Sequence, residues 1–554
     1  MAKKVIIIGG VAGGASAAAR LRRLDEKAEI IMFEKGEHVS YANCGLPYFI
    51  GGEITERSAL ILQTPASFKT RFNVDVRVLS EVVEIDRKAK TVKVKNTKTG
   101  EFYRESYDKL ILSPGAEPVK PPIDGISAKG VFTLRNIPDT YQIKDYLAHN
   151  SCQTAVVVGG GYIGVEMAEN LRRAGLAVTL VEMQPQIIAP LDFDMACEIH
   201  RYLKSKGVTL LLGNAVEAIR ETGSGLDVSL ANGQHIKADI LILSIGVKPE
   251  SSLAKNAGLA VTERGAIVVG EDMLTSDPDI YAVGDAVEII DFVTGHKGLV
   301  PLAGPANKQG RLAADNICGA QKSYGGTQGS AILKVFEMTV ATTGINEKTA
   351  KQLGLDYDKC FTYSGSHASY YPGAADMCVK TIFEKTTGKI LGVQIVGFHG
   401  TDKRCDVFAS AIRFGATAHD LCRLELCYAP PYSSAKDPVN MVGFVIENVL
   451  TGQVKNFHWH DVQDLLGKTN LTLLDTRTQK EYTRGHIEGF INIPVDELRS
   501  RLHELDPAKP IYVSCQIGLR GYIACRILSQ NGFDCYNLSG GYKLYSTVLG
   551  EKLF

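Results

Sequence analysis

The sequence carries no net charge, no long hydrophobic run and only one tryptophan, Trp459. Lys plus Arg and Asp plus Glu both number 61 in 554 residues, so no basic field is available to hold nucleic acid nonspecifically. The longest apolar runs, such as residues 5–8, have the length of a buried strand and fall far short of a membrane span. The N-terminus also lacks the apolar stretch and cleavage site of a signal peptide. We therefore expect neither a nucleic-acid partner nor a membrane partner.

A dense cysteine framework is also missing. Twelve cysteines are scattered along the chain, which is typical of a reducing compartment, and most fit as small buried apolar side chains. Together with the missing signal peptide, this pattern favours a cytoplasmic location. Cys422 and Cys427 have the spacing of a redox dithiol, but no phosphate-binding turn lies near them, so we interpret both as structural.

Cys44 has no neighbouring cysteine in its segment, Ser40-Tyr-Ala-Asn-Cys-Gly-Leu-Pro-Tyr48, and the next cysteine is Cys152. A single cysteine cannot form a local disulfide, so its oxidised form must be a mixed disulfide, a persulfide or a sulfenic acid. Pro47 is typical of a first helical turn, which predicts that Cys44 lies at or just before a helix N-terminus. The helix dipole there favours the thiolate.

The first of two glycine-rich turns, Gly9-Gly-Val-Ala-Gly-Gly14, lies between a predicted strand at 5–8 and a predicted helix at 15–23. Glu34 follows twenty residues after Gly14, at the end of the next predicted strand. Such a turn places a pyrophosphate on a helix N-terminus, and the acid binds the ribose hydroxyls. Val11 replaces the middle glycine of the fingerprint, which is the residue that lets the backbone approach the pyrophosphate closely.

The second turn, Gly159-Gly-Gly-Tyr-Ile-Gly164, has all three glycines of the fingerprint, and Glu182 follows eighteen residues later. Glu182 would accept hydrogen bonds from a free ribose 2′-hydroxyl and repel a 2′-phosphate. The next three residues, from Met183 to Pro185, supply no cation for that phosphate. The sequence therefore favours NADH over NADPH, with use of both left open.

Each glycine turn is followed by a similar segment, 107–116 and 238–246, that predicts a strand ending in a tight turn. This duplication indicates two nucleotide-binding domains with the second inserted into the first. Two dinucleotide sites in one chain imply FAD and NAD(P)H. The fold class is α/β, with two Rossmann-like domains, an α+β domain of alternating strands, and a final compact α/β unit. The expected boundaries are an FAD-binding domain at 1–115 and 247–325, an NAD(P)H-binding domain at 116–246, the α+β domain at 326–450, a linker at 451–460 and the final α/β domain at 461–554.

The segment 275–285 resembles the second FAD motif of the pyridine-nucleotide disulfide reductases, in which the terminal aspartate holds the ribityl chain. That resemblance assigns this role to Asp285. The residues expected to bind the cofactors are Gly9, Gly10, Ala12, Gly13, Gly14, Glu34, Lys35, Gly115, Gly159, Gly161, Tyr162, Gly164, Glu182, Gly284, Asp285 and Ala303.

Three segments together make residues 1–450 similar to the coenzyme A disulfide reductases. They are the extended first turn from Gly9 to Arg23, the Ser40-x-x-x-Cys44 segment, and Ala429-Pro-Pro-Tyr-Ser-Ser-Ala-Lys-Asp-Pro438. The resemblance implies that Ser16, Arg20, Arg23, Ser40 and Asn43 contact coenzyme A, with Arg71 and Lys436 near its phosphates. Taken alone, Arg20, Arg22 and Arg23 would more often form a solvated helix face.

The same resemblance implies a homodimer in which two tyrosines reach the active site of the partner subunit. Tyr428 matches one of them. Tyr370 is assigned as the other, although the neighbouring Tyr371 is an open alternative, and a core role for either is the competing interpretation.

The C-terminal segments Asp475-Thr-Arg477, Glu481, His486 to Pro494 and Cys515-Gln-Ile-Gly-Leu-Arg520 resemble a single rhodanese domain. A six-residue loop can aim backbone N–H groups at the Cys515 sulfur and stabilise a thiolate or persulfide, and Arg520 adds positive charge. A phosphatase loop, the main rival, needs five residues between cysteine and arginine, whereas this sequence has four. An inactive rhodanese fold is disfavoured because both Cys515 and Arg520 are present.

The combined sequence predicts an FAD enzyme in which NADH reduces a mixed disulfide between Cys44 and coenzyme A. Its substrates would be coenzyme A disulfide and coenzyme A persulfide or polysulfide, with Cys515 carrying sulfane sulfur as a persulfide. Two alternatives remain. One is an NADH oxidase or peroxidase that uses a Cys44 sulfenic acid. In the other, the flavoprotein half is a regulatory scaffold and the rhodanese domain is the only catalyst.

Overall fold

A computed structural model describes residues 3–552, so the expected domain limits at 1 and 554 fall outside the described residues. The chain divides into two compact units. The first contains residues 1–187 and 207–329, and the second contains residues 188–206 and 330–554.

The first unit begins with a five-stranded parallel sheet in the order β18-β7-β1-β2-β3. Its strands are β1 (Lys4–Ile8), β2 (Glu29–Phe33), β3 (Asp75–Arg77), β7 (Lys109–Leu112) and β18 (Ile280–Ala282). Val5, Ile6 and Ile7 are fully buried, because helices cover both faces of such a sheet and both side-chain directions of a strand must be apolar. The return of the chain to form β18 was expected from the sequence.

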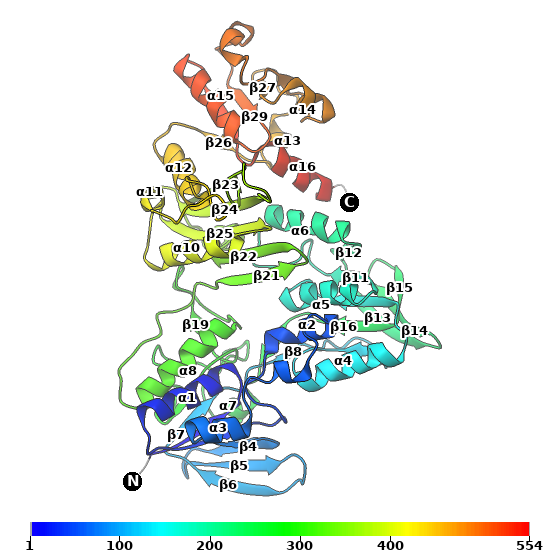
Figure 1. The fold of residues 1–554 in the computed structure, drawn as a ribbon, viewed down its shortest axis with the longest axis vertical. Coiled ribbons are helices and arrows are strands. Elements are labelled where there is room, and N and C mark those ends of the chain that lie inside the picture. The colour runs from blue at the N-terminus through cyan, green and yellow to red at the C-terminus, as the bar shows by residue number, and fades with distance from the viewer. Residues whose placement is uncertain (1–2, 553–554) are drawn as a thin grey trace. The chain divides into compact units, whose positions relative to one another are not determined.

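Helices α1 (Ala12–Leu24), α3 (Pro65–Phe72) and α8 (Ala303–Ile317) pack around this sheet. In Figure 1, α1 and α8 lie side by side although almost 300 residues separate them in the chain. They come so close that a Cβ added to Gly310 of α8 would stand 2.2 Å from the Gly13 carbonyl oxygen of α1. The shorter elements here are a turn of 3₁₀ helix η1 (Asn43–Gly45), α2 (Leu46–Gly51), η2 (Arg57–Leu60), α7 (Ser252–Asn256), the antiparallel sheet β4 (Ser80–Asp86), β5 (Thr91–Asn96) and β6 (Phe102–Ser106), and the pair β19 (Ile289–Ile290) and β20 (Lys297–Gly298).

A second parallel sheet in the same unit repeats this plan in the order β12-β11-β10-β16-β9. Its strands are β9 (Val131–Phe132), β10 (Thr154–Val158), β11 (Ala177–Glu182), β12 (Val208–Leu212) and β16 (Ile240–Leu243). Helices α4 (Ile137–His149) and α5 (Tyr162–Arg173) accompany it, as does the antiparallel sheet of β13 (Val216–Thr222), β14 (Gly225–Leu230) and β15 (His235–Ala238). The chain enters this domain through β8 (Ala116–Pro118) and leaves it through β17 (Val247–Pro249), and these two strands form an antiparallel pair. The predicted duplication and insertion are therefore confirmed.

The second unit contains an antiparallel five-stranded sheet in the order β21-β22-β25-β24-β23. Its strands are β21 (Ala331–Val335), β22 (Met338–Gly344), β23 (Tyr357–Gly365), β24 (Asp376–Glu384) and β25 (Ile390–Gly397), and its helices are α9 (Glu347–Gln352), α10 (Thr401–Arg413), α11 (Ala418–Arg423) and α12 (Pro438–Leu450). The alternating strands expected for this α+β domain are present.

The last domain of this unit is a parallel sheet in the order β26-β30-β29-β27-β28. Its elements are β26 (Asn456–Phe457), α13 (Val462–Leu465), β27 (Thr472–Asp475), α14 (Gln479–Arg484), β28 (Ile491–Asn492), η3 (Leu498–Ser500), η4 (Leu502–Glu504), β29 (Ile511–Ser514), α15 (Leu519–Gln530), β30 (Cys535–Leu538) and α16 (Gly541–Lys552). Part of the segment expected as a linker thus forms an edge strand of this sheet. The four-part α/β fold class is confirmed.

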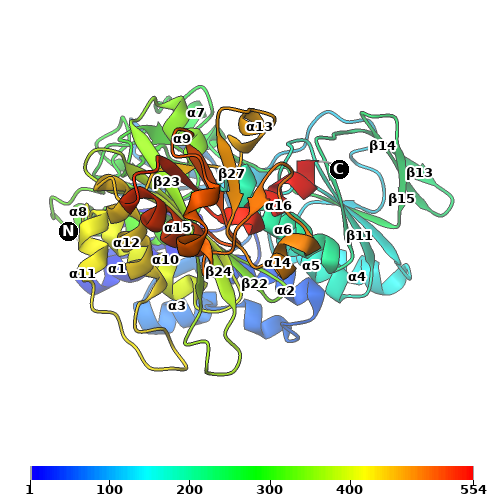
Figure 2. The ribbon, with the colours of Figure 1, turned by 90° about the horizontal axis from the view of Figure 1, so that it is seen from above.

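Helix α6 (Phe193–Ser205) interrupts the range expected for the NAD(P)H domain and belongs to the second unit. It lies beside α16 (Figure 2). At its N-terminus Asp194 accepts two hydrogen bonds of 2.9 Å from the fully buried Lys380 of β24, and the Trp459 indole donates to the same carboxylate at 3.1 Å. Lys380 also pairs with Glu347 at 2.8 Å. This buried ionic cluster holds α6, α9 and β24 together and explains the single tryptophan by packing at a domain junction.

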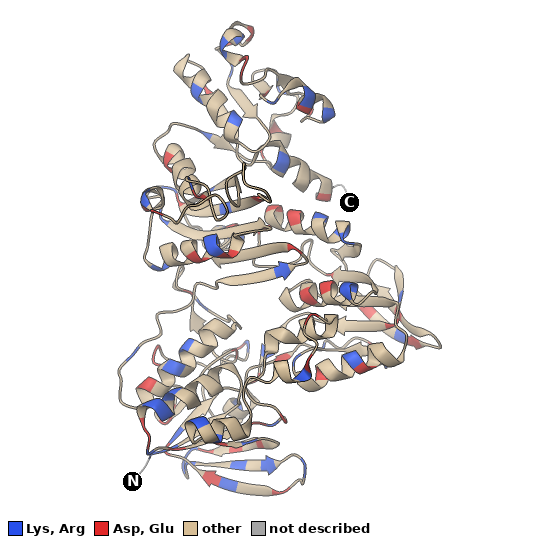
Figure 3. Cartoon of the chain, viewed as in Figure 1, with Lys and Arg blue, Asp and Glu red and all other residues tan. Residues whose placement is uncertain are grey.

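Charges of the two signs are intermixed along the ribbon in Figure 3, and their numbers are equal. Within residues 3–552, no helix combines the length and the apolar character that a membrane crossing requires. In the same residues, no group of three or more His, Cys, Asp or Glu side chains is arranged to hold a metal ion.

Candidate active sites

The first glycine turn lies between β1 and α1, where the predicted dinucleotide site should be. Gly9 has a φ of +97°, and a Cβ there would stand 2.1 Å from the Ser113 carbonyl oxygen at the end of β7. Only glycine fits this position. The Glu34 carboxylate accepts a hydrogen bond from the Gly10 N–H at 3.0 Å and from the Gly36 N–H at 2.9 Å. The turn, the helix N-terminus and the acid therefore converge on one edge of the sheet.

The second glycine turn has the same geometry. Gly159 has a φ of +104°, and a Cβ there would meet the Ser244 carbonyl oxygen at 2.4 Å. Glu182 accepts from the Gly160 N–H at 2.6 Å and from the Gln184 N–H at 2.7 Å. A Cβ on Gly161 would have no atom within 4 Å, so the space over this backbone is open for a phosphate. Both turns thus fit a dinucleotide pyrophosphate at a helix N-terminus.

The remaining residues expected at the flavin lie at the same edge of the first sheet. Gly115 follows β7, and Gly284 and Asp285 follow β18. The Gly284 N–H donates to Gln309 at 2.7 Å, and burial raises the pKa of the Asp285 carboxyl, partly offset by the Arg135 charge. Ala303 is the first residue of α8, so a second helix N-terminus faces this edge. Lys35 instead forms an exposed ion pair with Glu117 at 3.2 Å.

Cys44 lies in η1, the turn directly before α2, and Pro47 stands in the first turn of that helix. The predicted position at a helix N-terminus is therefore confirmed. All twelve cysteines lie within the described residues and all are free, including Cys422 and Cys427. The expected preference for the thiolate stays a prediction, and the protein groups near Cys44 act against it. Burial and the charges of Glu166 and Asp285 raise the pKa of the Cys44 thiol, and α2 is only six residues long.

Glu166 is a residue of this site that the sequence analysis missed. It lies on α5, two residues after the second glycine turn, and α5 packs against α2. The Tyr48 hydroxyl, on the helix that follows Cys44, donates to the Glu166 carboxylate at 3.4 Å. Burial raises the pKa of Glu166 to about 7, with a further contribution from the Glu169 charge. The carboxyl can therefore exchange a proton near neutral pH, and a polar residue so close to a phosphate-binding turn was the available signal in the sequence.

The residues expected to contact coenzyme A have diverse surroundings. Arg20 pairs with Asp315 at 2.6 Å, Ser16 donates to Asn307 at 2.5 Å, and the Ser40 N–H donates to the Gly10 carbonyl at 2.8 Å. Asn43, Arg23, Arg71 and Lys436 are exposed. Ser16, Arg20, Arg23, Ser40, Asn43 and Arg71 belong to the first unit, whereas Lys436 belongs to the second.

Arg22 is not part of a solvated helix face, contrary to the alternative interpretation of the arginine cluster. Its side chain is 5% exposed. The guanidinium donates to five backbone carbonyls, among them those of Phe72 at 2.8 Å and Ala28 at 2.8 Å. Arg22 therefore ties the end of α1 to the chain after α3.

Two tyrosines that the sequence singled out meet on the surface of the second unit. The hydroxyls of Tyr370 and Tyr428 are 2.8 Å apart, and the side chains are 73% and 47% exposed. This hydrogen bond raises the pKa of Tyr370. Tyr371 instead packs its ring against His367, so the geometry favours Tyr370 as the functional partner of Tyr428. Neither Tyr370 nor Tyr428 is a core residue.

The Cys515–Arg520 loop connects β29 to α15, as predicted. Cys515 is fully buried, and the Gly518 N–H donates to its sulfur at 3.1 Å. Arg520 forms a two-bond ion pair with Glu481 of α14 at 2.6 and 2.8 Å, and these hydrogen bonds lower the pKa of Glu481 to about 2. Behind the loop, the buried Arg477 pairs with Asp475 at 2.7 Å and reaches Gln516 at 3.4 Å. The loop is thus held by two arginine–carboxylate pairs.

Two dinucleotide turns, a solitary cysteine beside them and a separate sulfur-binding loop define a class, the dinucleotide-dependent oxidoreductases that act on sulfur. Family models agree with this assignment. Residues 3–310 match the pyridine nucleotide-disulphide oxidoreductases, residues 330–438 match the dimerisation domain of the same family, and residues 458–547 match the rhodanese-like domain. The chain belongs to the pyridine nucleotide-disulphide oxidoreductase family and carries a C-terminal rhodanese-like domain.

Individual proteins extend this match over the whole chain. The crystal structure of reduced CoADR-RHD from Bacillus anthracis has a TM-score of 0.97 and 53% identity, covering 100% of this chain and 99% of that one. An NAD-dependent persulfide reductase from A. fulgidus has a TM-score of 0.91 and 40% identity, covering 98% and 100%. The coenzyme A disulfide reductase of Staphylococcus epidermidis is 36% identical over 80% of this chain and 99% of its own length, and an NADH oxidase of Methanocaldococcus jannaschii is 36% identical over 79% and 97%. The sequence-based family identification is confirmed.

Proposed function

We propose that the chain is a cytoplasmic, homodimeric reductase that uses FAD and NADH to reduce coenzyme A disulfide and coenzyme A persulfide or polysulfide. The observation that carries this proposal is Cys44, a solitary cysteine next to two dinucleotide turns. The relatives named for coenzyme A disulfide and persulfide reduction support the choice of substrate. The domain boundaries expected from the sequence are part of this proposal, except that α6 is not assigned to the NAD(P)H-binding domain and β26 is not assigned to the linker.

The Cys44 thiolate attacks the substrate at the sulfur bonded to coenzyme A. With coenzyme A disulfide, the sulfur–sulfur bond breaks, one coenzyme A thiolate leaves, and a Cys44–coenzyme A mixed disulfide forms. With the persulfide, the leaving group is hydrosulfide. Bound FAD and NADH supply the two electrons that return the mixed disulfide to two thiolates. Ser16, Arg20, Arg23, Ser40, Asn43, Arg71 and Lys436 hold coenzyme A in this proposal.

The protein groups around Cys44 manage charge and protons. Glu166 and Asp285 oppose the thiolate, so a neutral Glu166 favours the reactive form. The hydroxyls of Tyr370 and Tyr428, supplied by the partner subunit, donate a hydrogen bond to the departing sulfur. Their mutual contact of 2.8 Å would position one hydroxyl as donor. The rhodanese-like domain carries sulfane sulfur as a persulfide on Cys515, with Arg520 and the Gly518 N–H beside it.

Anaerobic turnover with NADH and a coenzyme A persulfide tests the proposal. We expect the wild-type chain to release sulfide and Cys44→Ser to release none, because that variant has no thiolate to accept coenzyme A. Cys515→Ser serves as a matched control, since it should keep the reduction of coenzyme A disulfide and lose sulfur transfer from thiosulfate or polysulfide. Unchanged sulfide release by Cys44→Ser would remove the proposal.

The NADH oxidase of Methanocaldococcus jannaschii, a relative of equal identity, supports a second candidate function. In that case Cys44 would be oxidised to a sulfenic acid, and NADH would be consumed with oxygen or peroxide. An oxygen electrode separates the two functions. The third alternative, a flavoprotein scaffold for a rhodanese, requires that NADH fail to bleach the flavin.

A further inference from the structure

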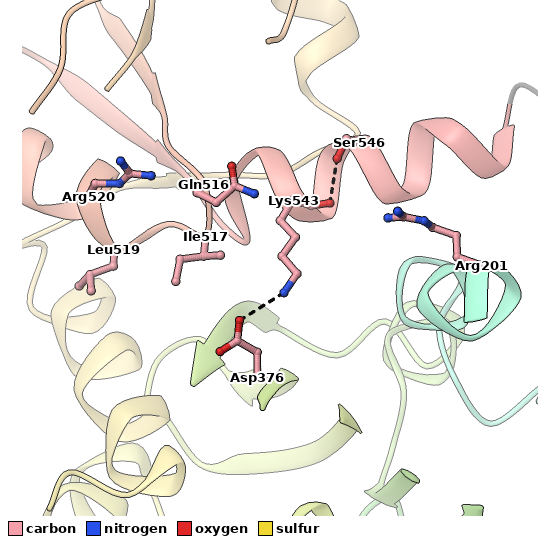
Figure 4. Close-up of a pocket in the computed structure, with 8 residues that line it drawn as sticks. All are labelled: Arg201, Asp376, Gln516, Ile517, Leu519, Arg520, Lys543 and Ser546. Carbon is pink, nitrogen blue, oxygen red and sulfur yellow. Dashed lines mark hydrogen bonds and ion pairs between the residues drawn. The ribbon is translucent and has the colours of Figure 1, made fainter. Parts of the chain in front are cut away.

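A pocket of about 570 Å³ opens beside the rhodanese-like loop, inside the second unit. Figure 4 shows its lining, which comes from four parts of the chain. Gln516, Ile517, Leu519 and Arg520 come from the loop and α15, Lys543 and Ser546 from α16, and Asp376 and Arg201 from β24 and α6. We call this space the cation pocket, after Arg201, Lys543 and Arg520.

The cations of this pocket differ in how far their charge is already neutralised. The charge of Arg520 is neutralised by the Glu481 carboxylate, to which it donates two hydrogen bonds. Lys543 has a longer contact of 3.5 Å with Asp376, whose side chain is 62% exposed. Arg201 donates to the hydroxyl of Thr547 at 2.7 Å, and no carboxylate within residues 3–552 contacts it. In Figure 4 the Arg201 side chain extends from α6 toward α16, and Lys543 extends from α16 toward Asp376. Arg201 and Lys543 therefore have charge left for an anion.

Size and polarity indicate what kind of anion fits. A volume of about 570 Å³ falls in the range of sites that take whole small molecules, and a sulfur oxyanion of a few atoms would leave most of it empty. The wall near the loop is partly apolar, with Ile517 and the 54% exposed Leu519. The wall opposite carries Arg201 and Lys543. A ligand with an anionic end and a less polar arm is complementary to this arrangement.

We propose that the cation pocket is a second binding site for a phosphorylated thiol, with Arg201 and Lys543 holding its phosphates and its thiol directed to the Cys515 loop. This inference rests on the proposed function, because coenzyme A is the phosphorylated thiol that the function supplies. The site is separate from the residues proposed to hold coenzyme A at Cys44. It makes coenzyme A the acceptor of sulfane sulfur, so that the rhodanese-like domain produces the persulfide that the Cys44 site reduces.

The transfer balances as follows. A donor such as thiosulfate loses its outer sulfur to the Cys515 thiolate and leaves as sulfite, and the outer persulfide sulfur then stands about 2 Å beyond Sγ. The coenzyme A thiolate attacks that outer sulfur. The bond to Cys515 Sγ breaks, its electron pair returns to Cys515 as the thiolate, and coenzyme A leaves as its persulfide. No net electrons are exchanged, so this half-reaction needs no NADH.

The test measures coenzyme A persulfide formed from thiosulfate without NADH, in the full-length chain carrying Cys44→Ser so that the reductase cysteine takes no coenzyme A. The acceptors are coenzyme A and pantetheine, which has the same thiol arm and no phosphate. We expect the KM for coenzyme A to be lower than that for pantetheine, and to rise on the order of tenfold in Arg201→Ala and in Lys543→Ala, as expected for loss of a charge-assisted hydrogen bond. The KM for pantetheine should stay unchanged in both variants.

Lys204→Ala is the matched control, because Lys204 is another cation of α6 that pairs with Glu551 at 2.8 Å and does not line the pocket. It should leave both KM values unchanged. Equal KM values for coenzyme A and pantetheine in the parent chain would overturn the proposal without any pocket variant. So would a rise in the KM for thiosulfate alone, which would mean that the pocket holds the donor anion, or no coenzyme A persulfide at all.

The reductase reaction separates this result from the proposed function. With Cys44 intact, Arg201→Ala and Lys543→Ala should reduce preformed coenzyme A disulfide with NADH at the parental KM. Failure of the wild-type chain in that assay counts against the proposed function and leaves the persulfide-transfer result to stand by itself.

Discussion

At the scale of single residues, the charges of two acids act on the Cys44 thiol. Glu166 and Asp285 both raise the pKa of its thiol, and Glu166 itself titrates near pH 7. The charge on one group therefore controls the reactivity of the other. The hydrogen bond from Tyr48 to Glu166, where α2 meets α5, links Glu166 to the segment that carries Cys44.

Glu166→Gln should make Cys44 reactive at lower pH. Above about pH 7 the wild-type Glu166 is ionised and opposes the thiolate, and the neutral amide removes that repulsion. The measurement is the pH dependence of iodoacetamide labelling of the Cys44 peptide, followed by mass spectrometry. Glu101→Gln, in an exposed turn, is the control and should leave the curve in place. A curve for Glu166→Gln that moves to higher pH contradicts the assignment.

At the scale of elements, the two cofactor sites depend on close backbone packing at the glycine turns. Gly9→Ala should give a chain that loses FAD, because its Cβ would overlap the Ser113 carbonyl oxygen and move the turn from the N-terminus of α1. Gly100→Ala is the matched control. Its φ is also positive, at +77°, but a Cβ there meets nothing within 4 Å, so it should cost only about 1 kcal/mol and keep the flavin. The ratio of flavin to protein absorbance measures both, and equal flavin loss would refute the steric argument.

The buried ionic cluster gives a second prediction for elements. Lys380→Met leaves Asp194 and Glu347 without their central cation and should destabilise the second unit by about 3–5 kcal/mol. Lys351→Met removes another partner of Glu347, one that is 64% exposed, and should cost no more than about 1 kcal/mol. Thermal unfolding of the holoprotein compares them. Similar unfolding midpoints for the two variants would show that burial does not decide the cost.

Short motifs made most elements predictable, whereas packing between distant segments did not. Gly9, Gly159 and the Cys515 loop each sit in a local pattern whose geometry is set by neighbouring residues. Glu166 approaches the Cys44 segment only because α5 packs on α2, and its partner Tyr48 is 118 residues away in sequence. Arg201 lines the pocket beside the rhodanese-like loop because α6 belongs to the second unit, away from its neighbours in sequence. No local sequence pattern predicts the position of Glu166 near Tyr48 or the position of Arg201 in the pocket.

At the scale of the whole molecule, the proposed homodimer assigns the exposed Tyr370–Tyr428 pair to the active site of the partner subunit. We predict that Cys44→Ser homodimers and homodimers carrying both Tyr370→Phe and Tyr428→Phe are impaired in coenzyme A disulfide reduction. A heterodimer of one chain of each kind, isolated with two affinity tags, should recover about half of the wild-type rate per dimer, because one site is then intact. No recovery in the heterodimer would mean that the tyrosines act within their own chain. Unimpaired homodimers with Tyr370→Phe and Tyr428→Phe would mean that the tyrosines have no role in this reaction.

The most direct measurement of the central claim is the intact mass of the protein as isolated, without reductant, followed by mapping of the Cys44 peptide. We expect one coenzyme A joined to Cys44 by a disulfide, released on addition of NADH and absent from Cys44→Ser. A disulfide from Cys44 to another cysteine of the chain, or a sulfenic acid in a protein that carries no coenzyme A, would contradict it.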